Sequence, residues 1–373
     1  MTVQIKHFGR TAAILSIAAL GLTACGQANN TSDSSNNGSD NGDAKQVSGT
    51  LSGAGASSQE SAIGAWTAGL KETQKDLNVQ YNPAGSGAGR KAFLSGQASF
   101  AGSDASLKEE ELADAEKMCG PEGAINIPAY ISPIAIVVNL EGVDKINLDA
   151  ETLAKIFAEK ITTWNDPAIA ALNEGVDLPD TKIIPVHRAD KSGTTDNFTD
   201  YLAENAKDAW PAGNVEEWPS DLGGEAAQGT SALVGVVQKS NGAIGYADKS
   251  AAGDLTLANI KVGENFQAPE EDAAAKTVEI SDRLEGKNEN DMAVRINRTS
   301  TEEGTYPLVL VSYHIYCSSY KEQSTVDMIQ AWGHYVVSEE GQKAANAAAG
   351  SAPMTEAMRN DAAKAIDSIK VAE

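Results

Sequence analysis

The order of apolar segments predicts an α/β protein in which short strands alternate with amphipathic helices. Residues 51–54 are a short run of small residues with strand character. The next segment, Gln59 to Thr73, is amphipathic, with Ile63, Trp66 and Leu70 on one helical face. The alternation continues to the C-terminus without an internal repeat, and it indicates at least two sheets.

The later elements are expected in the same way. The apolar run 125–139 is interrupted by Pro128 and Pro133 but is expected as one long strand. Ser106 with Glu109 three residues later matches a capping box and predicts a helix start. Further strands are expected at 79–82, 100–102, 183–187 and 306–317. Further helices are expected at 90–95, 152–158, 197–205, 326–337 and 354–369.

The N-terminus has the features of a bacterial lipoprotein signal. Lys6 and Arg10 precede an apolar run of about 12 residues, which is too short to span a bilayer of roughly 30 Å. The run ends in the lipobox Leu-Thr-Ala-Cys, with Cys25 last. We expect residues 1–24 to be a signal peptide and Cys25 to be diacylated, which would tether the chain to the extracytoplasmic face of the membrane. The alternative is an ordinary secretory signal with an incidental cysteine.

Residues 25–46 are almost entirely Asn, Ser, Gly, Asp, Thr and Ala. Such a segment cannot bury enough apolar surface to fold, so a disordered linker is expected here. The folded body should begin near Val47. The remaining length is enough for two domains of ordinary size.

The net charge is −23, and removal of Lys6 and Arg10 with the signal would make it −25. A nucleic-acid-binding function is therefore not expected. Cys119 and Cys317 would both lie in an oxidising compartment, where a disulfide between them is plausible. The four histidines and the cysteines lack metal-ligand spacing, so no metal site or cofactor is expected.

Three glycine- and serine-rich turns each precede a predicted helix, at residues 53–58, 85–89 and 190–195. Helix starts present unpaired backbone N–H groups and the positive end of the helix dipole. Three such turns, with Arg188 just before the third, point to an oxyanion ligand. The second turn is not a nucleotide P-loop, because Arg90 stands where the second glycine of that motif must be.

From about Gly53 onward, the chain resembles the substrate-binding lipoproteins of bacterial phosphate-specific ABC transporters. The most specific segments are 53–57, 100–107, 161–167, 188–194 and 242–246. The resemblance implies a two-lobed periplasmic-binding-protein ("Venus flytrap") fold whose lobes close on phosphate. It implies that residues 47–130 and 306–373 form lobe I and that residues 131–305 form lobe II. Strands 125–139 and 306–317 would cross the hinge and, if antiparallel, would bring Cys119 close to Cys317.

The resemblance also implies a set of phosphate ligands, in which Asp190 would hold Arg188 in place. The implied phosphate-binding residues are Ser57, Ser58, Ser86, Asp104, Arg188, Ser192, Gly193 and Thr194. Implied partners are inorganic phosphate and the permease and ATPase subunits of a phosphate transporter.

Three positions depart from the usual family pattern. Ser58 and Gln59 stand where an aromatic residue and a proline are common, and Ser58 is expected to act through its backbone N–H. Residues 87–89 replace a more usual serine–glycine–glycine, which leaves open whether Ser86 or a neighbouring N–H is the main donor. Lys191 replaces a glycine and could add positive potential at the cleft.

Asp104 favours phosphate over sulfate, because a carboxylate near an anion makes sense if the anion carries a proton. Phosphate at neutral pH has at least one P–OH, whereas sulfate has none. An unmatched carboxylate–oxyanion contact costs several kcal/mol, about a thousandfold in affinity. The alternative for Asp104 is a simple helix N-cap.

Other classes of function remain possible on the sequence alone. A serine hydrolase would need a nucleophile elbow with histidine and acid partners, and no such motif occurs in the right context. A phosphatase would need metal ligands or an activated nucleophile. A binding protein for sulfate or molybdate is opposed by Asp104. A phosphate-binding adhesin or sensor cannot be separated from a transport protein.

Overall fold

The computed structural model describes residues 45–285 and 288–373. The predicted signal peptide, the lipidation of Cys25 and nearly all of the predicted linker lie outside the described residues. Lys45 forms an ion pair with Asp327 at 2.7 Å. Two residues later, the Val47 N–H donates to Gln74 Oε1 at 2.9 Å. Val47 is therefore tied to the body by a hydrogen bond, and the start of the folded body near it stays a prediction.

A nine-stranded sheet runs through the body with the path β2-β1-β3-β14-β4-β8-β6-β7, and β9 also pairs with β4. β1 pairs in parallel with β2 and β3, and β6 pairs in parallel with β7 and β8. The bounds are β1 Gly49–Gly55, β2 Leu77–Asn82, β3 Phe100–Ser103, β4 Ala124–Asn139, β6 Ile184–Arg188, β7 Glu225–Ala227, β8 Ala243–Asp248, β9 Thr256–Leu257 and β14 Val309–Cys317. The α/β class expected from the sequence is confirmed.

The long strand β4 joins the two lobes. Its first part, residues 124–133, pairs antiparallel with β14, and its second part, residues 134–139, pairs antiparallel with β8. Pro128 has no N–H to give to the ladder, and the β4–β14 register shifts at Ser312 and Tyr313, where the partner strand passes Pro128. The next strand pairing, Tyr313 of β14 with Ser103 of β3, places Ser312 beside Asp104.

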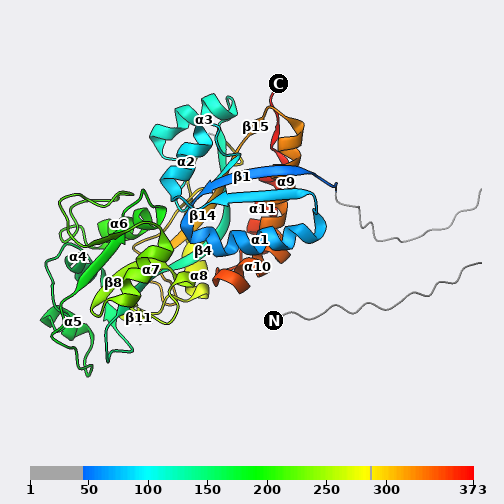
Figure 1. The fold of residues 1–373 in the computed structure, drawn as a ribbon. Helices are drawn as coiled ribbons and strands as arrows, with labels where there is room; N and C mark the ends of the chain where they lie inside the picture. Colours follow the sequence, from blue (N-terminus) through cyan, green and yellow to red (C-terminus); the bar gives the residue numbers. More distant parts are fainter. Residues whose placement is uncertain (1–44, 286–287) are drawn as a thin grey trace, which may run out of the picture. The chain divides into compact units, whose positions relative to one another are not determined.

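Helices cover the sheet in both lobes (Figure 1). The first lobe contains α1 Glu60–Thr73, α2 Ser86–Leu94, α3 Leu112–Cys119, α9 Gln323–Val337, α10 Glu339–Ala349 and α11 Glu356–Asp367. The second lobe contains α4 Ala150–Phe157, α5 Pro167–Leu172, α6 Gly193–Asn205 and α7 Thr230–Lys239. The helix α8, Glu271–Glu279, packs against β4 and β14.

Short elements complete the fold. They are the 3-10 turns η1 Ser57–Gln59, η2 Glu109–Glu111 and η3 Lys249–Ala251, and the strands β5 Asn147–Leu148, β10 Asn259–Val262, β11 Asn265–Gln267, β12 Asp282–Arg283, β13 Val294–Arg295, β15 Ser319–Tyr320 and β16 Lys370–Val371. The β12–β13 pair lies within the sequence range expected for the second lobe. Its neighbour Asp291 nevertheless accepts from Asn126 of β4 at 2.8 Å, and the Val294 N–H donates to Tyr313 of β14 at 3.0 Å. This segment therefore packs against first-lobe strands.

The apolar face predicted for the first helix is confirmed. Ile63, Trp66 and Leu70 of α1 are all buried. Trp66 meets Trp332 of α9 edge to face, with ring centroids 6.2 Å apart. This packing fixes α1, and with it the turn that precedes α1, against the first-lobe sheet.

The capping box predicted at Ser106 is wrong. The helical turn begins three residues later, where the Lys108 N–H donates to Glu111 Oε2 at 2.9 Å. The chain before it is held by a side chain instead, because the Leu107 N–H donates to Asn126 Oδ1 at 3.1 Å. Four helices, α5, α7, α8 and α10, were not expected from the sequence.

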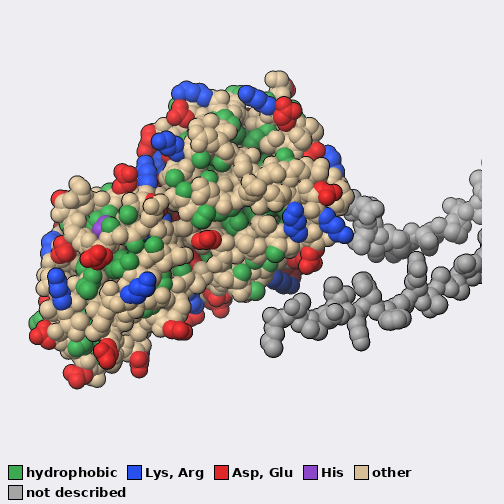
Figure 2. Space-filling view, in the orientation of Figure 1, with side chains coloured by type: hydrophobic (Ala, Val, Ile, Leu, Met, Phe, Trp, Pro, Cys, Tyr) green, Lys and Arg blue, Asp and Glu red, His purple; other side chains and the backbone are tan. Residues whose placement is uncertain are grey.

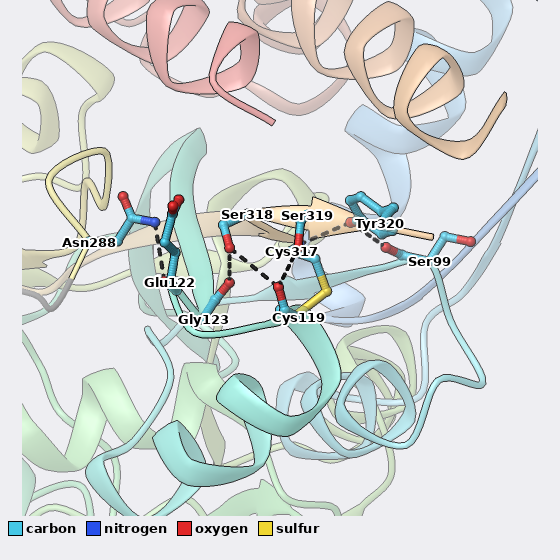
Figure 3. Close-up of a disulfide and its surroundings, with 9 residues drawn as sticks. All are labelled: Ser99, Cys119, Glu122, Gly123, Asn288, Cys317, Ser318, Ser319 and Tyr320. Atoms are coloured by element: carbon cyan, nitrogen blue, oxygen red, sulfur yellow. Dashed lines mark hydrogen bonds between the residues drawn. A yellow bond between two sulfur atoms is a disulfide. The ribbon is translucent and has the colours of Figure 1, made fainter. Parts of the chain in front are cut away.

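The disulfide between Cys119 and Cys317 is present, with the two Cα atoms 4.8 Å apart (Figure 3). It joins the last residue of α3 to the last residue of β14. Ser318 Oγ donates to the Gly123 carbonyl at 2.6 Å, and Ser319 Oγ donates to the Cys119 carbonyl at 2.8 Å. The bridge and these bonds tie the turn after α3 to the end of the sheet.

Acidic and basic side chains are interspersed over the face seen in Figure 2, with no single large patch of either sign. Within the part of the chain that the structure describes, no helix has the length and apolar character needed to cross a membrane.

Candidate oxyanion-binding site

The starts of four helices meet where the two lobes face each other. In the first lobe these are η1, which leads into α1, and α2; in the second lobe they are α6 and α7. Each start presents backbone N–H groups without helical partners and the positive end of a helix dipole. The side chains at these starts are buried. Water is therefore largely excluded from the region between the four helix starts.

Asp104, the residue after β3, lies between the lobes and is only 3% exposed. Its Oδ1 accepts from Ser58 Oγ at 2.6 Å and from Ser312 Oγ at 2.5 Å, and its Oδ2 accepts from Thr194 Oγ1 at 3.0 Å. Burial raises the pKa of Asp104 above its ordinary value, and these three hydroxyl donors together with the charge of Arg188 limit the rise. The carboxylate is thus held by donors from both lobes.

The direction of the Ser312 hydroxyl is fixed by Gln59. The Gln59 amide Nε2 lies 3.2 Å from the Tyr313 carbonyl, which can only accept, so this atom must be the N–H₂ group. The same amide donates to Ser312 Oγ at 2.6 Å. The hydroxyl proton of Ser312 is then free to point only toward Asp104.

His314 continues this hydrogen-bond chain into the core. Its Nε2 lies 3.0 Å from Gln59 Oε1, an acceptor, so Nε2 carries the proton. Its Nδ1 therefore accepts from Tyr316 OH at 3.0 Å. Burial lowers the pKa of His314 to about 3, which keeps the ring neutral. A chain of bonds with one direction thus ends on the Asp104 carboxylate.

Arg188, the last residue of β6, supplies the positive charge and is 3% exposed. Its Nε donates to Asp190 Oδ1 at 2.7 Å, and its Nη2 donates to Asp190 Oδ2. Asp190 Oδ1 also accepts from the Gly229 N–H at 2.9 Å. Burial acts to raise the pKa of Asp190, but Arg188 and the Gly229 N–H outweigh it and hold that pKa below its ordinary value. Asp190 is therefore charged and orients the guanidinium, as expected.

Ser57 and Thr230 meet across the lobes. Their hydroxyl oxygens are 3.0 Å apart, and the Thr230 N–H donates to Ser57 Oγ at 3.2 Å. Arg188 Nη1 lies 3.4 Å from Thr230 Oγ1, so the Arg188 cluster reaches Ser57 through Thr230. Gly229 before the helix has a φ of +78°, a conformation that favours glycine.

The start of α6 packs tightly against the start of α2. Ser192 is the N-cap of α6, and its Oγ accepts from the Thr195 N–H at 3.2 Å. A Cβ added to Gly193 would lie 2.5 Å from Ser86 Oγ and 2.7 Å from the Asp104 Cβ. Only glycine allows the lobes to approach this closely here. Ser86 Oγ in turn accepts from the Asp104 N–H at 3.1 Å.

The structure thus brings together the residues that the sequence analysis selected. Ser58, Ser86, Thr194 and the backbone of Gly193 surround Asp104, whereas Ser57 and Arg188 belong to the Thr230 side of the same cleft, and Ser192 caps the helix between them. Ser58 contacts Asp104 through its hydroxyl, whereas the role expected for its backbone N–H stays a prediction. Asp104 is not an N-cap, because the next helical turn begins at Glu109.

Three contributors were missed: Thr230, Ser312 and Gln59. The sequence Gly229-Thr230-Ser231 has the same glycine–hydroxyl pattern as the other three turns and could have been found by that signal. Ser312 sits inside an apolar strand, and nothing in its neighbours signals a role. Lys191 lies toward the edge of the cleft, half exposed, with its Nζ 3.8 Å from Glu216.

This arrangement can bind a small tetrahedral oxyanion. It combines a desolvated cation, helix starts with free N–H groups, several hydroxyls, and one carboxylate that could accept a hydrogen bond from a protonated ligand oxygen. Among residues 45–285 and 288–373, no group of three or more His, Cys, Asp or Glu side chains is placed to hold a metal ion.

Comparisons with known proteins agree with an oxyanion-binding function. Residues 41–340 match the family model of the PBP superfamily domain. The chain is 35% identical over 375 residues to the phosphate-binding protein PstS2 of Mycobacterium bovis, covering 97% of this chain and 99% of that one. It is 34% identical to PstS 3 of Mycobacterium leprae, covering 88% of this chain and 90% of that one.

Solved structures show the same fold. A phosphate-binding protein from Stenotrophomonas maltophilia aligns with a TM-score of 0.65 at 20% identity, covering 85% of this chain and 94% of that one. PfluDING, a periplasmic phosphate-binding protein solved with phosphate bound, aligns with a TM-score of 0.67 at 18% identity, covering 84% and 92%. The chain therefore belongs to the PstS phosphate-binding proteins of the PBP superfamily.

Proposed function

We propose that this protein binds inorganic phosphate outside the cytoplasm and delivers it to the permease of an ABC transporter. The observation that carries the proposal is the pairing of Arg188, a cation, with Asp104, an acceptor, at the meeting point of four helix starts. The mycobacterial relatives named above are phosphate-binding proteins, which supports the same ligand.

The proposed ligands are Ser57, Ser58, Ser86, Asp104, Arg188, Ser192, Gly193 and Thr194, to which Thr230 is added. Phosphate entry would exchange the Ser57–Thr230 and Thr194–Asp104 bonds for bonds to phosphate oxygens. One P–OH would donate to Asp104, and the charge of Arg188 with the helix-start N–H groups would balance the anion. The surface charge of the chain does not prevent this, because exposed charges are screened over about 10 Å at 0.1 M salt.

The transport role extends the proposal to the ends of the chain. We propose a lipid anchor on Cys25 and a linker up to about residue 46, which together would hold the body at the extracytoplasmic face of the membrane. The proposed lobes are 47–130 with 306–373, and 131–305, except that the segment 282–295 packs against first-lobe strands. Opening about β4 would expose the site, and closure would present both lobes to the permease.

Titration calorimetry of the mature chain with phosphate tests the proposal. Full burial of the anion should give a dissociation constant near micromolar or below, about −8 kcal/mol or stronger. Neither heat nor a thermal shift with millimolar phosphate would overturn the assignment.

A further inference from the structure

We propose that Arg90 and Glu216 form an ionic latch between the lobes that sets how long the closed protein retains its oxyanion. The proposal deepens the proposed function and rests on it for the identity of the ligand. It assigns a positioning role to two side chains that lie outside the ligand set described above.

Arg90 lies on α2, and its side chain is completely buried, with 0% exposed. Its Nη2 donates to both carboxylate oxygens of Glu216, at 2.8 and 2.9 Å. Its Nε donates to Glu111 Oε2 at 2.8 Å, and its Nη1 donates to Ser103 Oγ at 3.0 Å. The Arg90 guanidinium therefore donates to protein acceptors from all three of its nitrogen atoms. Arg188, by contrast, lies among the proposed phosphate ligands.

The two acidic partners of Arg90 come from different lobes. Glu111 follows β3 in the first lobe, the same lobe as Arg90 itself. Glu216 lies in the long connection between α6 and β7 in the second lobe, and its side chain is 6% exposed. Separation of the lobes would break the Glu216 contact and leave the Glu111 contact intact. One guanidinium thus forms one permanent pair and one pair that exists only on closure.

Three cations face Glu216. Besides Arg90, Lys108 Nζ lies 3.8 Å from Glu216 Oε1, and Lys191 Nζ lies 3.8 Å from Glu216 Oε2. Lys108 also pairs with Asp196 of α6 at 2.8 Å, which is a second contact between the lobes. The cluster holds three cations and three carboxylates, Glu111, Asp196 and Glu216, so its charges balance only when the lobes are together. Arg90 and Glu216 are the most deeply buried of the six, whereas Lys108 and Lys191 are partly exposed.

An ion pair that forms only when the lobes close should change the rate of ligand release more than the rate of ligand binding. A bond present only in the closed state shifts the open–closed equilibrium toward closure, and a closed cleft must open before the ligand leaves. Removal of one partner from a buried charge pair typically raises the dissociation rate, because the other charge is left buried and unpaired. The Lys191 side chain, unusual at its position, contributes here and not at the anion itself.

The test compares Glu216→Gln with the matched control Glu111→Gln in the full-length chain. Both variants neutralise a carboxylate on the same guanidinium, but only the first weakens a contact between lobes. Stopped-flow release of phosphate should accelerate roughly tenfold or more in Glu216→Gln. It should change by less than about threefold in Glu111→Gln, whose loss should appear in thermal stability. Equal release rates in wild type and Glu216→Gln, or equal acceleration in both variants, would overturn the latch.

Two further measurements keep the test decisive. Arg90→Gln should accelerate release like Glu216→Gln, and the double variant should release no faster than either one; additive effects would contradict a direct pair. Hydrogen exchange without added phosphate separates the latch from the ligand assignment. Glu216→Gln should speed exchange at the starts of α2 and α6, and Glu111→Gln should not. If wild type bound no phosphate, the proposed function would fail, and this exchange pattern alone would decide the latch.

Discussion

The centre of the cleft and its rim use charge in different ways. At the centre, Arg188 is held by Asp190 of its own lobe, and Asp104 is held mainly by neutral hydroxyls. At the rim, Arg90 and Lys108 pair directly with Glu216 and Asp196 of the other lobe. The groups at the centre can therefore exchange their present hydrogen bonds for bonds to a ligand. The charged groups at the rim instead form ion pairs between the lobes when the lobes close. The comparison predicts that central substitutions change affinity and selectivity, and that rim substitutions change residence time.

The largest expected effect is at Arg188. Arg188→Ala removes a charge-assisted donor from a desolvated site and should weaken phosphate binding by roughly 2–5 kcal/mol. Calorimetry measures the loss, and circular dichroism should show an unchanged fold. Wild-type affinity in this variant would mean that the centre of the cleft has been misidentified.

Asp248, which pairs with Ile134 where β4 changes its partner strand from β14 to β8, should behave like neither region. Asp248, at the end of β8, accepts from Tyr130 OH at 2.9 Å and from the Ser250 N–H at 3.0 Å, and burial raises its pKa from 3.8 to about 6. Because the folded state binds this proton more tightly, the stabilisation is complete below about pH 4 and is lost as pH rises through about 6.

Asp248→Asn cannot ionise, so its stability should not show this loss. Between pH 4 and pH 7 the unfolding free energy of wild type should fall relative to the variant by up to about 3 kcal/mol. Urea unfolding at four pH values measures the difference. Parallel pH profiles for the two proteins would show that Asp248 is ionised throughout.

The smallest expected effect is at Thr230. Thr230→Val keeps the shape but removes one neutral hydroxyl from the centre, so phosphate binding should weaken by about 1 kcal/mol, or fivefold. The exposed neighbour Ser231 provides a control, since Ser231→Ala should leave the affinity unchanged. Equal effects of the two substitutions would place Thr230 outside the site.

The residues proposed to contact the ligand were easier to predict from the sequence than the residues that hold them in place. Glycine–hydroxyl turns before helices and a nearby arginine are local patterns, so Ser57, Ser86, Arg188 and Thr194 could be selected from sequence. Ser312 could not be selected, because its role depends on the pairing of β14 with β3, which brings a strand distant in the sequence to Asp104. The Arg90–Glu216 pair depends on the closed lobes in the same way.

The secondary structure likewise divides into elements that local sequence patterns predicted and elements that they did not predict. Strong periodicity predicted α1, α9 and β4, whereas the capping box at Ser106 failed because a tertiary contact, Leu107 to Asn126, holds the chain extended. The helix α10 was missed because its buried face consists of small or polar residues, Gly341, Gln342, Ala345 and Ala349, which give no strong apolar signal in the sequence.

The central claim is that Asp104 selects an oxyanion carrying a proton, and competition against bound phosphate tests it most directly. At neutral pH, arsenate should displace phosphate from wild type, whereas sulfate should be roughly a thousandfold weaker. Asp104→Asn should retain phosphate binding and gain measurable sulfate binding, because an amide can donate to a bare oxygen. Sulfate that competes with wild type as well as phosphate does would contradict the role of Asp104 and weaken the phosphate assignment itself.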